Sequence, residues 1–121
     1  MELFSKSKRV ATIFYYGKNE MVKKLIDLIL GYTNAIIEFD LEKVKLSGYQ
    51  IEALASRLNV NIKDLLNTND KNYDKVSKNF CEQDILKLIE HNQHLLKLPI
   101  VLIGNKGIFI NSFTDVLKIT E

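Results

Sequence analysis

The sequence contains a single cysteine, Cys81, and this limits its thiol chemistry. One cysteine cannot form an intrachain disulfide, a CxxC redox pair or a cysteine-based zinc site. Cys81 lies near the predicted start of a helix, where a thiolate is favoured, so a substitute nucleophile is one interpretation. The favoured interpretation is a plain helix-start cysteine, because free thiols are commonly small buried groups. Its low cysteine content also predicts a reducing compartment, and we expect a cytoplasmic protein.

The two histidines, His91 and His94, stand three residues apart at a predicted helix end. A metal pair would need further ligands, and the sequence places none nearby. Favourable charge at the C-terminus of a helix is the preferred interpretation. We therefore predict neither a metal nor another cofactor.

Gly17, Lys18 and Asn19 join a predicted strand to a predicted helix and form a candidate binding site. Backbone N–H groups at the helix start, together with the ammonium of Lys18, would attract an anion. Asn19 is also a good N-cap residue, and a plain loop with a cap is the preferred local interpretation. A second glycine-containing segment, 104–107, leads from one strand into another, which predicts a hairpin turn and not a phosphate-binding loop.

The first forty residues predict the order strand, helix, strand. An apolar run at 10–16 predicts a strand buried on both faces, and a branched run at 34–39 predicts another. The helix that Asn19 caps lies between them, so the two strands are expected to be parallel. Tyr15 and Tyr16 are expected to point to opposite faces of the first strand, with one of them lining a cleft.

The rest of the chain predicts a helical stretch, then two strands and a final helix. Helical segments are expected to start at Ser47, where Gln50 completes a capping box, at Asn61, and at Asn79 or Cys81 with an end near Asn92. Pro99 precedes a strand at 100–103, a second arm follows at 108–110, and Ser112 with Asp115 caps the last helix. We predict one α/β domain over residues 1–121, with a four-stranded mixed sheet and a helical insertion at about 46–97.

Composition is that of an ordinary soluble domain, with 46% hydrophobic and 26% charged residues and a net charge of +2. Lysines gather near the start of the sequence at Lys6, Lys8, Lys18, Lys23 and Lys24. They would attract an anionic partner, but a solvated lysine-rich surface is favoured, and direct nucleic-acid binding is not predicted. The first nine residues lack the apolar core of a signal peptide, and no segment is long enough to cross a bilayer, so no membrane association is expected.

These elements resemble the arsenate reductase/Spx branch of the thioredoxin-like fold, the ArsC-like proteins. Leu65-Leu66-Asn67-Thr68 before Tyr73 is similar to the family's Leu-Phe-Asn-Thr motif and its following tyrosine. Leu98-Pro99-Ile100-Val101 is similar to the family's Arg-Pro-Ile-Val strand, and Asp115-Val116-Leu117 to its ending. The resemblance covers nearly the whole chain, and it implies a glutaredoxin-like arrangement with an all-helical insertion between the second and third strands.

The sequence departs from the family at the residues that carry its chemistry. Asn19 stands where the family has its nucleophilic cysteine, and an asparagine cannot act as a redox nucleophile. Leu98 replaces the arginine before the proline, and Asn67 and Asn111 replace other oxyanion-binding arginines, although the Spx branch tolerates asparagine at the first of these. The family implies a cis peptide before Pro99, whereas base rates favour a trans proline that starts an edge strand. The resemblance thus implies a degenerate active site with no catalytic residue and a ligand or partner site at Gly17, Lys18, Asn19, Leu98 and Pro99.

Three hypotheses on function follow from the resemblance and its departures. The leading one is a redox-inactive relative that binds a protein partner or small ligand in a regulatory role, without enzymatic activity. RNA polymerase is the partner that the Spx resemblance implies. The alternative is an arsenate reductase-like oxidoreductase, linked to glutathione or glutaredoxin, that uses Cys81 or an external thiol. The third is self-association as a structural subunit, and the oligomeric state is not predicted.

Overall fold

A computed structural model describes residues 4, 7–69 and 80–120 of the chain. Lys6, Tyr73 and Asn79, which drew attention in the sequence, lie outside the described residues. The four strands form one sheet in the order β2-β1-β3-β4. Their bounds are β1 (Val10–Tyr15), β2 (Ala35–Asp40), β3 (Ile100–Ile103) and β4 (Lys106–Phe109). β1 pairs parallel with β2 and antiparallel with β3, and β3 pairs antiparallel with β4, which confirms the predicted mixed sheet.

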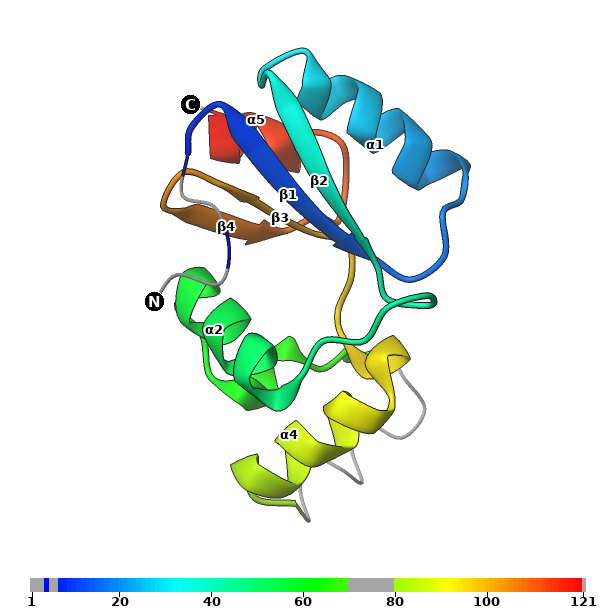
Figure 1. The fold of residues 1–121 in the computed structure, drawn as a ribbon, viewed down its shortest axis with the longest axis vertical. Coiled ribbons are helices and arrows are strands. Elements are labelled where there is room, and N and C mark those ends of the chain that lie inside the picture. The colour runs from blue at the N-terminus through cyan, green and yellow to red at the C-terminus, as the bar shows by residue number, and fades with distance from the viewer. Residues whose placement is uncertain (1–3, 5–6, 70–79, 121) are drawn as a thin grey trace.

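Helices cover both faces of the sheet (Figure 1). One face is covered by α1 (Glu20–Leu30) and α5 (Asp115–Thr120). The helical insertion covers the other face with α2 (Gly48–Leu58), η1 (Ile62–Leu65), α4 (Glu82–His91) and η2 (Gln93–Leu95). This confirms the predicted order of elements, including an all-helical insertion between β2 and β3. No helix among the described residues is long and apolar enough to span a membrane.

The side chains of β1 alternate between two apolar cores, as the period of a strand requires. Ala11, Ile13 and Tyr15 pack in the core beneath α1 and α5. Phe14 points to the other face and packs in the core beneath the helical insertion, with its ring centroid 5.0 Å from that of Phe39. β1 is therefore buried on both faces, as its continuous apolar run predicts.

The predicted helix caps are largely confirmed. Asn19 caps α1, and Ser47 forms a capping box with Gln50 at the start of α2. Of the two predicted starts for the third helix, the structure uses Cys81, which directly precedes α4. At the start of the last helix Ser112 and Asp115 are paired as predicted, through the carboxylate of Asp115, which accepts the backbone N–H groups of Asn111 and Ser112.

The hairpin of β3 and β4 follows Pro99 and forms the centre and one edge of the sheet. The Leu98-Pro99 peptide is cis, as the resemblance implies. The alternative of a trans proline that starts an edge strand is wrong, because β3 lies between β1 and β4. Gly104 has a φ of +60°, which a two-residue hairpin turn requires and glycine adopts without strain. The guanidinium of Arg57 donates to the carbonyls of Phe4 and Gly104, which ties the end of α2 to this turn.

Candidate functional site

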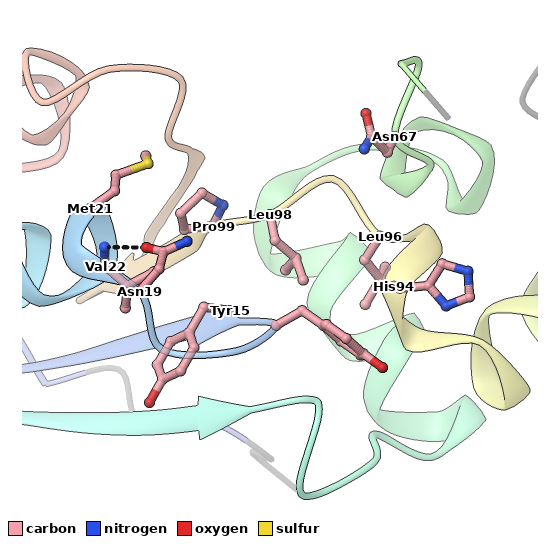
Figure 2. Close-up of a pocket in the computed structure, with 10 residues that line it drawn as sticks. Tyr15, Asn19, Met21, Val22, Asn67, His94, Leu96, Leu98 and Pro99 are labelled. Carbon is pink, nitrogen blue, oxygen red and sulfur yellow. Dashed lines mark hydrogen bonds between the residues drawn. The ribbon is translucent and has the colours of Figure 1, made fainter. Parts of the chain in front are cut away.

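A cleft of about 260 Å³ opens where the sheet meets the helical insertion. Its walls come from the end of β1, the start of α1, the segment after η1, the η2 turn and the approach to β3 (Figure 2). Of the five predicted site residues, Asn19, Leu98 and Pro99 line this cleft. Gly17 and Lys18 lie in the loop beside it and are not among its lining residues.

Asn19 occupies the N-terminal end of α1 and faces the cis Leu98-Pro99 peptide across the cleft (Figure 2). Its backbone is extended, with φ of −106° and ψ of −177°, and its Oδ1 accepts the N–H of Val22 at 2.9 Å. That N–H is one of the first-turn donors that a helix cannot satisfy internally. An amide thus stands at a position where a thiol would receive the same support from the helix.

The loop of Gly17 and Lys18 is surrounded by carboxylates. The N–H of Gly17 donates to Asp40 at 3.0 Å, and the ammonium of Lys18 lies 3.0 Å from Oε1 of Glu38. A Cβ on Gly17, whose φ is +79°, would lie 3.7 Å from the carboxylate of Glu42. Three carboxylates therefore lie around the Gly17-Lys18 loop, one of them paired with the Lys18 ammonium, so the N–H and the charge that could hold an anion already have partners. These contacts favour the loop-and-cap interpretation over an anion site.

Tyr15 and Glu38 are joined by a hydrogen bond at the rim of this loop. The Tyr15 hydroxyl donates to Oε1 of Glu38 at 2.8 Å. Burial raises the pKa of the Tyr15 phenol well above its usual value, and the hydrogen bond to Glu38 adds to the effect. Hydrogen bonds from Lys18 and then from Tyr15 lower the pKa of Glu38. The phenol is thus held neutral and the carboxylate ionised at neutral pH.

Tyr15→Phe should reduce the loss of stability that the protein shows above pH 10. In the unfolded chain Tyr15 ionises near pH 10, whereas in the folded chain its raised pKa keeps it protonated. Rising pH therefore stabilises the unfolded state, and wild type should lose about 1 kcal/mol more than Tyr15→Phe between pH 9 and pH 11. Urea unfolding at both pH values measures this. Tyr49→Phe, at an exposed position, should behave as wild type, and an equal loss in Tyr15→Phe would contradict the assignment.

Asn67 and His94 complete the cleft from the side of the insertion. Asn67 is fixed by two interactions, its N–H donating to the carbonyl of Leu95 at 2.8 Å and its Oδ1 accepting the N–H of Asn69 at 3.0 Å. His94 lies in the η2 turn, where its ring meets the edge of Tyr16 at a centroid distance of 6.2 Å. The sequence predicts that one of Tyr15 and Tyr16 lines the cleft, and in the structure both do.

Comparison with solved structures gives the fold. An arsenate reductase from Vibrio cholerae superposes with a TM-score of 0.77 at 14% identity, covering 92% of this chain and 98% of that one. A Yersinia pestis protein assigned as an arsenate reductase gives 0.75 at 18%, covering 90% and 99%. An ArsC family related protein from Bacteroides fragilis gives 0.68 at 13%, covering 90% and 97%. This chain has the arsenate reductase fold. No protein-family model and no curated protein matches the sequence.

Within the arsenate reductase fold of this chain, Cys81 lies away from the cleft. It directly precedes α4, is exposed, and its Sγ lies 3.1 Å from Oδ2 of Asp84. Cys81 thus stands at a helix start, as the favoured interpretation predicts, but its thiol is exposed and not buried. Cys81 precedes the N-terminal end of α4, whereas the lining residues His94 and Leu96 follow its C-terminal end. A helix of ten residues is about 15 Å long. The sole thiol of the sequence is thus separated from the start of α1.

His91 and His94 do not share a helix end. α4 ends at His91, and Asn92 leaves the helical conformation with φ of −138° and ψ of 76°. His91 remains exposed, whereas His94 moves into η2 and lines the cleft. The helix ends near Asn92 as predicted, so His94 lies beyond the helix end, and the charge role predicted for it at the C-terminus of that helix is wrong. Among the described residues no group of three or more histidine, cysteine or acidic side chains could hold a metal ion.

Asn111 also lies outside the cleft. Its backbone N–H donates to Asp115 at the start of α5, and it is not among the lining residues. Of the two asparagines that the resemblance places at arginine positions, Asn67 alone lines the cleft, together with Leu98. The described lining of the cleft therefore carries amides, aromatic rings, a histidine and apolar groups, and neither lysine nor arginine.

Proposed function

We propose that this chain is a redox-inactive arsenate reductase/Spx-like protein that binds a partner through the cleft and acts in regulation. The observation that carries the proposal is the amide of Asn19 at the N-terminus of α1, opposite cis-Pro99. The helix start and the cis proline of the arsenate reductase fold are present at this place, but an asparagine stands where the nucleophilic cysteine would be. Cys81, at the other end of α4, supplies no thiol to this position.

The chemistry of the lining residues supports the absence of arsenate reduction. Reduction of an oxyanion by a thiol needs a thiolate as nucleophile and cationic donors to bind the charged substrate. Asn19 offers an amide, Leu98 an aliphatic group and Asn67 a second amide. None of the three can attack arsenic or carry the charge of a guanidinium.

A protein partner is favoured by the rim of the cleft. Tyr16 is 44% exposed and Met21 is 37% exposed, and both line the cleft. Tyrosine and methionine are enriched in protein interfaces because they bury much apolar area while they adapt to the partner's shape. RNA polymerase, in the cytoplasm, is the partner that the likeness to the Spx branch suggests.

Two measurements test the proposal. Purified protein with arsenate, glutathione and glutaredoxin should show no turnover above the reaction without protein. Turnover that vanishes in Cys81→Ser would establish the thiol-dependent reductase instead. Purified RNA polymerase from the source cells should bind wild type and the Tyr49→Ala control, but bind Tyr16→Ala at least about fivefold more weakly.

Two other results would contradict the proposal that the chain binds a partner. A pull-down from native lysate that recovers no partner at stoichiometric yield would contradict it. A molecular mass that rises with protein concentration in light scattering, without any partner, would support self-association as the function.

A further inference from the structure

We infer that the cleft binds an uncharged amide group through its carbonyl oxygen, and that it discriminates against tetrahedral oxyanions. The inference rests on the proposed function, since it names the chemistry by which a partner peptide would be recognised. It follows from the donors that line the cleft, from the charges beside it and from its apolar walls.

The donors are the side-chain NH₂ groups of Asn19 and Asn67. Each of these amides uses its oxygen to accept a neighbouring backbone N–H, that of Val22 for Asn19 and that of Asn69 for Asn67. The oxygen of each amide is therefore fixed, and the nitrogen must point the other way. Figure 2 shows the Asn19 nitrogen on the side of Pro99 and the Asn67 nitrogen on the side that faces Leu98. Neither NH₂ group donates to a described residue, so both can serve a ligand.

The charges beside the cleft do not suit an oxyanion. The lining residues include neither lysine nor arginine, and Lys18 nearby is paired with Glu38. Asp40 and Glu42 add two more carboxylates around the loop that leads into α1. The N-terminus of α1 attracts negative charge, but Asn19 already accepts the Val22 N–H there, so this donor does not serve a ligand. A multiply charged oxyanion would lose its hydration without gaining a cationic partner.

The apolar walls complete the match to an amide. Leu96 and Pro99 are buried and Leu98 is half-buried at the floor, while the Tyr16 ring meets His94 at the side. A space of about 260 Å³ between such walls fits a short peptide segment or a carboxamide side chain. Two neutral donors matched to carbonyl oxygens then fix the orientation of the ligand.

Titration with three small probes, followed by ¹H–¹⁵N NMR, tests the inference. The probes are N-acetylglycinamide as the neutral amide, N-acetylglycine as its carboxylate counterpart, and inorganic phosphate as the oxyanion. The neutral amide should saturate shifts of the Asn19 and Asn67 side-chain NH₂ signals at a lower concentration than either anion. Tighter binding of phosphate or of N-acetylglycine, or no saturable shift with the neutral amide, would overturn the inference.

Two isosteric variants separate the donors from the fold. Asn19→Asp keeps an oxygen for the Val22 N–H and remains a good N-cap, and Asn67→Asp keeps one for the Asn69 N–H. Each removes an NH₂ donor and places a carboxylate against the ligand carbonyl, so affinity for N-acetylglycinamide should fall at least about fivefold. Asn105→Asp, in the exposed hairpin turn, is the matched control and should bind as wild type. Equal affinity in all three variants would overturn the assignment of the donors.

Failure of this inference and failure of the proposed function give different results. Thiol-dependent turnover would contradict the redox-inactive role and would leave the probe titrations unchanged. Preference for phosphate in a protein without turnover would overturn only the ligand class.

Discussion

A chain that carries Asn19→Cys together with Cys81→Ser should react with iodoacetamide about sixfold faster at pH 6 than an ordinary exposed cysteine. The N-terminus of α1 supports a thiolate at residue 19 through its dipole and the Val22 N–H, which Asn19 now occupies. A pKa lowered by about 1.5 units raises the thiolate fraction at pH 6 about thirtyfold. The lower nucleophilicity of a more acidic thiol reduces this gain to about sixfold.

The matched control is Asn105→Cys in the same Cys81→Ser background, because residue 105 is exposed in a turn and has no helix behind it. Alkylation followed by mass spectrometry gives both rates. Equal rates would contradict the view that the start of α1 still has the geometry of a thiol site. The new thiol should not restore arsenate turnover, because Leu98 and Asn67 remain without positive charge.

The order of elements was predictable because each segment carries its own local signal. These signals depend on residues close together in the sequence. They are the alternating burial on β1, the caps at Asn19 and Ser47, and the glycine-containing turn after β3. Three of the five predicted site residues line the cleft because the resemblance supplied the pairing of α1 with the Leu98-Pro99 segment, which local patterns alone do not give.

The electrostatics of the loop beside the cleft was not predicted, because it depends on β2. In the parallel register Tyr15 pairs with Asp40, so the carboxyl end of β2 brings Glu38, Asp40 and the following Glu42 beside Gly17. The sequence held a usable signal, since the ends of adjacent parallel strands meet at one edge of a sheet. Attention to Lys18 alone kept an anion site as a candidate beside the preferred loop-and-cap interpretation.

Gln93 gave a similar signal that was missed. It follows Ile85 and Ile89 at intervals of four in the sequence, where the apolar pattern of α4 predicts another apolar residue, but the structure places it in η2, beyond the end of α4. It is 3% exposed and joins two segments of the insertion. Its Oε1 accepts the Leu46 N–H at 3.0 Å, and its Nε2 donates to the carbonyls of Leu46, Ile89 and Glu90. This buried, fully hydrogen-bonded side chain links the loop before α2 to the end of α4.

Gln93→Leu should lower the free energy of unfolding by about 3 kcal/mol, although leucine fits the space. The substitution leaves the buried N–H and carbonyl of Leu46 without partners, and each unsatisfied group costs roughly 1–3 kcal/mol. Gln83→Leu at an exposed position of α4 makes the identical exchange and should change stability by less than about 0.5 kcal/mol. Urea unfolding of the two variants measures the difference. If both variants unfolded at the same urea concentration, the hydrogen bonds of Gln93 would contribute nothing to stability. Gln93 would then not be the residue that holds the neighbouring His94 in the cleft.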